Sequence, residues 1–241
     1  MHICHANLRG LTLHLLPPQP LFAGGLAVLD VKLVNPRRTP RHAIGVALLD
    51  TDNWSWADAP AQGESAVQVS FKPARRGLHR VPTLTAETRF PLGTFRVWTV
   101  WRPAAQVLVY PTPEAQPPAL PPGEPRSGTG VAASARASGE FDGVRGYQRG
   151  DPMKLIVWKK FAKSGELVSR DTVHMHRQEL WLDFARAGAL DAEGRLSRLT
   201  AWVLLADAQG LDYGLRLPGV EIKPGSGAAQ RLRCLEALAT C

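Results

Sequence analysis

The sequence predicts a multidomain protein of mixed α and β structure, in which a β-sandwich is followed by a linker and then by a small α/β domain. Three observations support this prediction. Apolar and polar residues alternate at a period of two in the first part of the chain, a proline-rich stretch follows, and strand-like and helix-like segments alternate in the last part. With 241 residues, of which 44% are apolar, the chain is long enough to bury two cores of ordinary size.

The first region, residues 8–111, is predicted to be the β-sandwich. The alternation that indicates half-buried strands is clearest in residues 29–33, 44–48 and 67–71. Further strands are expected at residues 11–16, 78–85, 95–101 and 106–110. About seven short strands over roughly a hundred residues match an immunoglobulin-like or fibronectin-like architecture. Such sandwiches usually bind or space other molecules and seldom catalyse.

Residues 112–139 are predicted to be a linker rich in proline, glycine and alanine. Residues 111–125 contain seven prolines, and residues 126–139 are mostly small or polar. Proline-rich spacers stay extended and small polar ones are flexible, so we expect a domain boundary here.

The last region, residues 140–241, is predicted to be the α/β domain. A helix is expected over residues 152–164, because Asp151 can cap it, Pro152 fits its first turn and Gly165 can end it. After it, the expected order is a strand at 167–173, a strand at 179–183, a helix at 192–209, a strand at 214–217 and a helix at 227–240. This alternation implies parallel strands in one small sheet that both C-terminal helices cover.

The segment from Glu140 to Asp171 combines aromatic and basic side chains in a way that suits a binding surface. In the expected helix, Leu155 and Trp158 recur at one-turn spacing and would face inward, which leaves the lysines exposed. The residues predicted to form the interaction surface are Arg145, Tyr147, Arg149, Asp151, Lys159, Lys160 and Lys163.

The same segment reads E-F-x-x-V-R-x-Y-x-x-G-D-x-x-K-x-I-x-W-x-x-x-A-K-x-x-x-L, which resembles the signature of the bacterial family known as domain of unknown function 58. Residues 76–77, 90–95, 180–183 and 213–219 are similar to that family's flanking patterns. The resemblance marks Phe141, Trp158 and Asp183 as signature residues with a structural role. It implies that the last domain is an abbreviated von Willebrand factor A-like fold.

The resemblance also implies a partner and a setting. Proteins of this family are linked to MoxR-type AAA+ ATPases, and they commonly carry two hydrophobic membrane segments just before the equivalent of residues 7–10. This chain begins close to that point. The expected location is therefore the cytoplasmic face of the inner membrane, with membrane attachment through segments that this sequence does not include.

No pattern in the sequence indicates an enzyme, a cofactor or a metal. Von Willebrand factor A-like metal sites begin D-x-S-x-S, whereas the run here is Asp183-Phe184-Ala185-Arg186-Ala187, which lacks both hydroxyl ligands. His174 and His176 follow the expected strand at 167–173 and would share one face if the chain stays extended, but no third ligand is fixed in sequence. The three cysteines have no metal-binding or disulfide spacing and fit a reducing compartment.

The sequence therefore favours a non-enzymatic protein-interaction or adaptor module. The alternative from another class is a protein that binds nucleic acid or another anionic ligand through Arg145, Tyr147, Arg149, Lys159 and Lys163, which the net charge of +8 also suits. A metal-dependent enzyme is the third hypothesis, and it lacks visible ligands.

Overall fold

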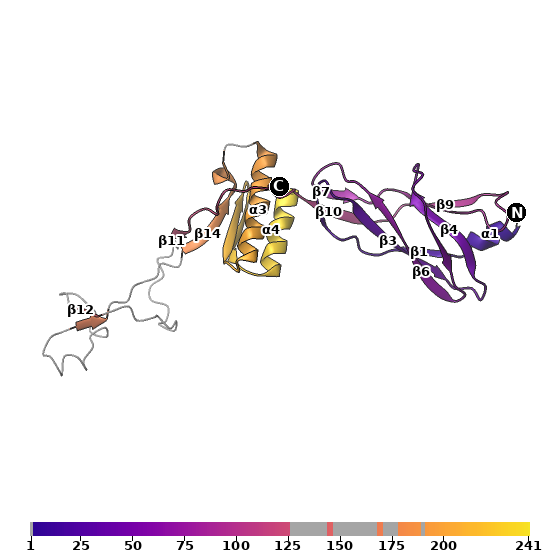
Figure 1. Cartoon of the computed structure of the whole chain (residues 1–241), viewed down its shortest axis with the longest axis horizontal. Coiled ribbons are helices and arrows are strands. Elements are labelled where there is room, and N and C mark those ends of the chain that lie inside the picture. The colour runs from indigo at the N-terminus through magenta and orange to yellow at the C-terminus, as the bar shows by residue number, and fades with distance from the viewer. Residues whose placement is uncertain (1, 126–143, 147–167, 171–177, 189–190) are drawn as a thin grey trace. The chain divides into compact units, whose positions relative to one another are not determined.

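A computed structural model describes residues 2–125, 144–146, 168–170, 178–188 and 191–241 of the chain. The chain divides into two compact units, residues 1–122 with 180–241 and residues 123–179. The described residues form mostly β structure, with the helices α1 (His2–Leu8), α3 (Ala192–Ala208) and α4 (Ala228–Thr240) (Figure 1). The expected mixture of α and β structure is confirmed. Within the described residues, no helix is long and apolar enough to cross a membrane.

Residues 12–110 form three sheets, which we call the β region. One sheet has the order β1 (Thr12–Leu15), β3 (Ala27–Asn35), β6 (Gly63–Phe71). The four-stranded sheet has the order β5 (Ser55–Ala59), β4 (Arg41–Leu48), β8 (Leu84–Thr88), β9 (Val97–Trp101). The third has the order β2 (Leu21–Phe22), β10 (Gln106–Tyr110), β7 (Gly77–Arg80).

One hydrophobic core joins these three sheets. Alternate residues of β3 point into it, and Leu29, Val31 and Leu33 are fully buried. Val46 of β4 and Val107 of β10 come from the other two sheets and are equally buried. Since full burial of one such side chain stabilises a protein by about 1.5 to 3 kcal/mol, the period-two pattern marks the residues that hold the sheets together.

The expected strand at 78–85 is two strands, β7 and β8, because the chain leaves one sheet and enters another there. β7 pairs with β10, β8 pairs with β4 and β9, and Pro82 lies between β7 and β8. Proline has no backbone N–H to donate to a ladder, so it favours a break at this position. β5 and α1 were not expected from the sequence.

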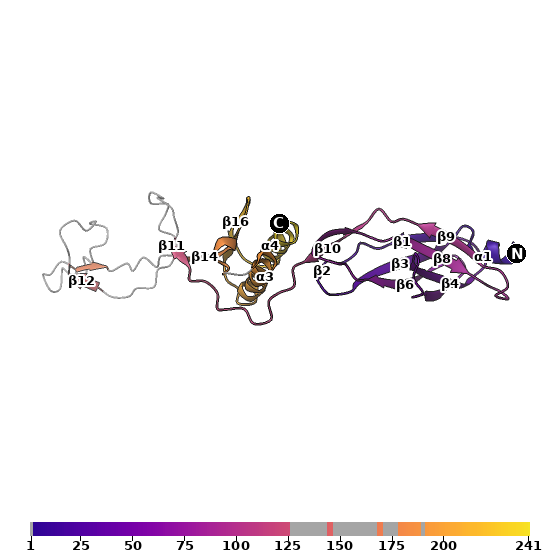
Figure 2. The same ribbon diagram turned by 90° about the horizontal axis from the view of Figure 1, so that it is seen from above.

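The C-terminal part is a small sheet with two helices against it (Figure 2). β14 (Gln178–Asp183) pairs in parallel with β15 (Tyr213–Leu217), as expected, but β15 also pairs antiparallel with β16 (Val220–Gly225), which was not expected. β11 (Glu124–Pro125) pairs with the start of β14. The predicted strands at 179–183 and 214–217 and both predicted helices are confirmed within one residue.

The spacing of apolar residues predicts one buried stripe on each C-terminal helix, formed by Leu196, Leu199, Val203 and Ala206 in α3 and by Leu232, Leu235 and Ala239 in α4. The structure buries these stripes with one exception. Leu199 and Val203 of α3 and Leu235 of α4 are buried with the strands in one core. Leu232 of α4 is 46% exposed, so its predicted place in the stripe is wrong. Asp191 caps α3 by accepting a hydrogen bond from the Gly194 amide at 2.9 Å.

Residues 111–122, at the start of the proline-rich stretch, lie against α3. The Glu114 carboxylate accepts two hydrogen bonds from the Arg198 guanidinium, at 2.8 and 3.0 Å. The Trp202 indole donates to the Pro118 carbonyl at 2.9 Å. The hydrogen bonds from Arg198 hold the pKa of Glu114 below its usual range. This part of the stretch is therefore bound to a helix along its length.

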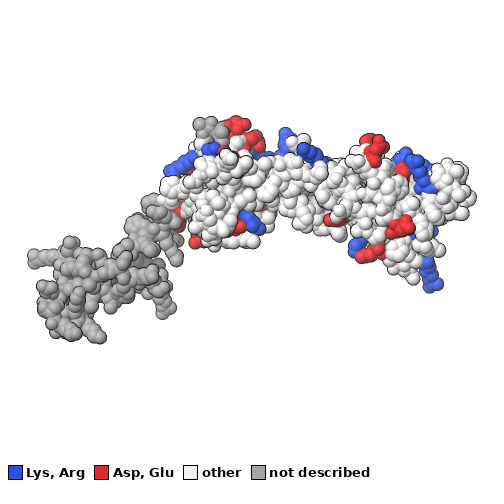
Figure 3. Space-filling model, viewed as in Figure 1, with Lys and Arg blue, Asp and Glu red and all other residues white. Residues whose placement is uncertain are grey.

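Charged side chains are interspersed on the described surface. Figure 3 shows Lys and Arg side chains in small groups, with Asp and Glu side chains near them and uncharged surface over much of the face in view. Ion pairs among the described residues include Lys32 with Glu64 at 2.7 Å and Arg231 with Asp207 at 2.9 Å. Exposed pairs of this kind contribute only about 0 to 1 kcal/mol each to stability.

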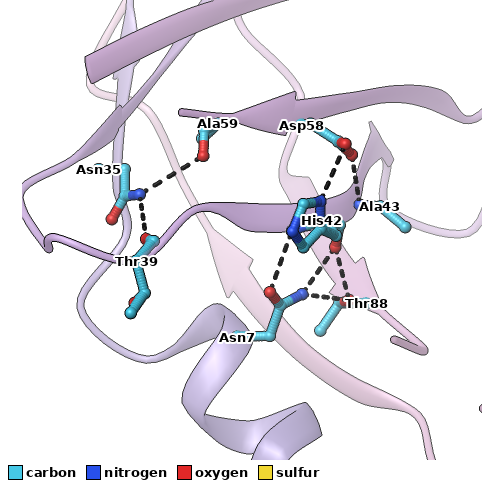
Figure 4. A network of polar contacts seen from close by, with 8 residues as sticks. All are labelled: Asn7, Asn35, Thr39, His42, Ala43, Asp58, Ala59 and Thr88. Atoms are coloured by element: carbon cyan, nitrogen blue, oxygen red, sulfur yellow. Dashed lines mark hydrogen bonds and ion pairs between the residues drawn. The ribbon is translucent and has the colours of Figure 1, made fainter. Parts of the chain in front are cut away.

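The short helix α1 is attached to the β region by one buried amide, that of Asn7 (Figure 4). Its Nδ2 atom donates to the His42 carbonyl at 2.7 Å and to the Thr88 hydroxyl at 2.8 Å, and its Oδ1 atom accepts from the His42 amide at 3.1 Å. Next to it, buried Arg41 donates to the carbonyls of Ala6 and Arg9 at the end of α1. A seven-residue helix is marginal alone, so these contacts stabilise it here.

Candidate functional site

Most of the residues predicted for the interaction surface lie outside the described residues. These are Tyr147, Arg149, Asp151, Lys159, Lys160 and Lys163, together with the signature residues Phe141 and Trp158 and the expected helix at 152–164. The backbone of Arg145 is described. It belongs to β12 (Val144–Gly146), which pairs antiparallel with β13 (Val168–Arg170) so that Arg145 lies opposite Ser169.

Asp183, the remaining signature residue, lies at the end of β14 and caps the short 3₁₀ helix η2 (Phe184–Arg186). Its Oδ1 atom accepts a hydrogen bond from the Ala185 amide at 2.8 Å. In the described part of the chain, no three His, Cys, Asp or Glu residues are grouped closely enough to hold a metal ion. The described contact of Asp183 thus gives this carboxylate a local structural role.

The outer face of the four-stranded sheet brings together aromatic and charged residues that are distant in sequence. The strand register places Trp56 of β5 beside Gly45 of β4, Gly45 beside Glu87 of β8, and Glu87 beside Trp98 of β9. Ile44 and Val46, the neighbours of Gly45, point into the core, so this row points away from it. We call this surface the aromatic face; its residues are Trp54, Trp56, Glu87, Arg89, Arg96 and Trp98.

Glu87 is buried although it lies on the outer side of the sheet. It is 1% exposed, and its carboxylate pairs with the Nε atoms of Arg89, at 3.2 Å, and Arg96. The arginine side chains are 57% and 51% exposed. A buried carboxylate with two partners fixes both guanidinium groups in place and leaves one net positive charge at the surface.

Tryptophan side chains form much of the rest of the aromatic face. The rings of Trp54 and Trp56 lie 5.8 Å apart and pass directly over Gly45, where a Cβ atom would come within 2.8 Å of the Trp56 ring. Glycine at position 45 therefore allows both rings to lie on the strand. Trp56 is 49% exposed and Trp98 is 57% exposed, so large apolar surfaces remain available to a ligand.

A groove lies on this face between the loop before β5 and the start of β9. Its lining consists of Leu49, Asp50, Thr51, Asp52, Trp54, Thr85, Glu87, Arg89, Arg96 and Trp98. Asp50 and Asp52 make one side acidic, whereas Arg89 and Arg96 make the other side basic. The groove thus offers hydrogen-bond acceptors, donors and aromatic surface together. Its lining contains no Ser, Cys or Lys beside a histidine, the pairing that would activate a nucleophile.

Sequence reasoning missed this site. The usable signal was the spacing of Trp54 and Trp56, because residues two apart in extended chain lie on the same face. The comparison with protein-family models gives no match for this chain, and the search of curated proteins gives none either. The site is therefore interpreted from its own chemistry.

Proposed function

We propose that the protein is a non-enzymatic interaction module that acts as an adaptor for an AAA+ ATPase of the MoxR type. The observation that carries the proposal of protein binding is the aromatic face, where exposed tryptophans lie on a sheet beside two arginines that pair with Glu87. Tryptophan and arginine are the residues most enriched among those that dominate binding energy at protein interfaces. The type of partner comes from the resemblance of residues 140–167 to domain of unknown function 58.

The proposal extends to the fold and the location. The β region is an immunoglobulin-like sandwich, and the C-terminal part is an abbreviated von Willebrand factor A-like fold. The interaction surface that the sequence predicts around Arg145 and the lysines contributes a second contact with the same partner. The adaptor works at the cytoplasmic face of the inner membrane.

A protein partner fits the groove better than a nucleic acid does. A phosphate backbone would face Asp50 and Asp52 on one side of the groove, and like charges repel. On the face in view in Figure 3, the charges of the described residues are also interspersed, whereas nucleic-acid interfaces concentrate basic residues on one surface. An interface with both signs of charge suits another folded protein with complementary charges.

The test measures binding of the full chain to a purified MoxR-type ATPase from the same genome by isothermal titration calorimetry. We expect the double variant Trp56→Ala and Trp98→Ala to bind roughly 30-fold more weakly or worse, because interface tryptophans commonly contribute about 2 kcal/mol or more. Leu78→Ala is the matched control, since Leu78 is 56% exposed but lies on β7 in another sheet.

Two results would contradict the proposal. Equal binding by the double variant and the wild-type chain would remove the aromatic face from the interface. Tight binding to nucleic acid that weakens steeply with salt, without binding to the ATPase, would favour the anionic-ligand alternative, since counterion release has that signature.

A further inference from the structure

The strand β9 forms an open edge of the four-stranded sheet. It pairs with β8 on one side, and among the described strands none pairs with its other side. Its sequence, Val97-Trp98-Thr99-Val100-Trp101, contains no charge and no proline. Trp98 is 57% exposed and Val100 is 44% exposed. β9 therefore presents free backbone groups next to exposed apolar side chains.

Soluble proteins usually protect such edges with charges, prolines, bulges or covering segments. The opposite edge of the same sheet is protected in this way. β5 carries the charged Asp58, is followed by Pro60, and is tied to β6 by a hydrogen bond from the Ser55 hydroxyl to the Gln68 carbonyl. The contrast shows that one edge of this sheet is closed and the other, β9, is left open.

We propose that β9 receives an extended segment of a partner protein as an added strand. In this mode, backbone hydrogen bonds provide affinity, and every second side chain of the added strand lies beside the exposed side chains of the edge. Trp98 and Val100 lie on the outer face, so alternate residues of the added segment are apolar and pack against them. This inference rests on the proposed function and specifies how the partner binds.

Charge defines the ends of the added segment. Arg96 directly precedes β9 and Arg102 directly follows it, and both are exposed. At the second end, Arg80 and Arg102 line a common groove beside the strand. The partner segment therefore has an apolar centre of about five residues, the length of β9, with acidic residues on both sides.

The experiment combines peptide selection with a proline scan of the full chain. Short random peptides displayed on phage are selected on the wild-type protein, and the affinities of the enriched peptides are measured by fluorescence anisotropy. We expect enriched peptides to alternate apolar residues and to carry Asp or Glu at their ends. Proline should be absent from the peptide positions whose amides face β9, because proline has no N–H to donate to the ladder.

The proline scan replaces Val97, Trp98, Thr99 and Val100 one at a time. Along an edge strand the amides point alternately toward β8 and toward the open side. Proline at the two positions that face β8 should lower the melting temperature. Proline at the other two should leave it nearly unchanged but weaken peptide binding roughly tenfold or more, because an edge hydrogen bond is lost and the ring obstructs pairing.

Three outcomes would overturn the inference. No enriched peptides, or equal binding to all four stably folded proline variants, would exclude strand addition at β9. A dimer of the chain in sedimentation that the open-side proline variants dissociate would show that a second copy occupies the edge instead.

The failure of this inference is separable from failure of the proposed function. If the ATPase binds the open-side proline variants normally, the adaptor function stands and strand addition fails. If peptide binding is lost in the open-side proline variants but the ATPase does not bind the wild-type chain, strand addition at β9 is supported and the assignment of the partner is wrong.

Discussion

Replacement of Asn7 by alanine should destabilise the β region, because this side chain makes three of the hydrogen bonds that join α1 to β4 and β8 (Figure 4). Alanine leaves the His42 amide and carbonyl without this partner in a buried setting, where Asn7 is 6% exposed. The His42 carbonyl keeps a longer contact with the Thr88 hydroxyl at 3.4 Å, so the loss is partial there. Each of the three hydrogen bonds contributes about 1 kcal/mol, and a polar group that stays buried without a partner costs more. We therefore expect the free energy of unfolding to fall by roughly 2 to 4 kcal/mol.

The assay is thermal unfolding followed by circular dichroism. For a chain of this size, each kcal/mol shifts the melting temperature by roughly 2 to 4 °C, which gives a decrease of roughly 5 to 15 °C. Asn53→Ala is the matched control, because Asn53 is exposed and lies in a loop. A change below about 0.5 kcal/mol for Asn7→Ala would refute the reasoning, since it would put this substitution among ordinary surface changes.

The variant Asn7→Asp tests the direction of the hydrogen bonds. Its carboxylate can still accept from the His42 amide, but an oxygen replaces the donor that lies 2.7 Å from the His42 carbonyl. Oxygen atoms at that distance repel, so we expect the folded state to favour the protonated carboxyl group and to raise its pKa. A group with a raised folded pKa adds stability at low pH, so this variant should approach the wild type in stability as the pH falls below about 4.

Two further predictions concern the C-terminal part. Glu114→Gln should lower the melting temperature at neutral pH, because the hydrogen-bonded ion pair with Arg198 lowers the folded pKa of Glu114. The stability that the ion pair adds is lost as the carboxylate becomes protonated, so the difference from the wild type should disappear as the pH falls below about 4. A difference that persists in acid would point to packing instead of charge. A thiol reagent at mildly alkaline pH should modify the exposed Cys241 quickly in the native protein and all three thiols only after unfolding, since burial raises the pKa of Cys234 to about 11; fast native labelling of Cys234 would show that its helix opens readily.

The elements that could be predicted from the sequence are those whose burial pattern is regular. β3 alternates so that every second residue is buried, and α3 begins at the capping Asp191 and ends just before Gly210, whose φ of +66° is left-handed. In each case, local spacing and the end signals agree with the packing. Such agreement between local and tertiary preferences makes an element predictable.

The elements that were missed depend on contacts that the sequence does not display. α1 is short and is held by Asn7 and Arg41 through partners more than thirty residues away. β16 has no buried residue and contains Pro224 and Gly225, so its pattern resembles a loop. Edge strands of this kind form because a neighbour pairs with them, and their own propensity contributes little.

The aromatic face was missed for a related reason. Trp54 and Trp98 line one groove although 44 positions separate them in the chain, and the pairing of β5 with β4, β4 with β8 and β8 with β9 brings them together. Glu87 looks like a surface carboxylate in the sequence, but Arg89 and Arg96 cover it. To know which side chains lie close together on a sheet, one must know the order and register of the strands. The alternation of apolar and polar residues does not give this information.

The proline content of residues 111–122 has an entropic consequence for their attachment to α3. A chain with few accessible backbone conformations loses little freedom when it is bound, and proline restricts the unfolded chain in this way. Ordering this segment against α3 therefore costs less conformational entropy than ordering a glycine-rich segment of equal length. The contacts of Glu114 and Pro118 with α3 have a smaller entropy loss to offset. A substitution of Pro117 by glycine would weaken this attachment through the unfolded state, by about 0.4 to 1 kcal/mol, even where every contact seen in the folded protein is retained.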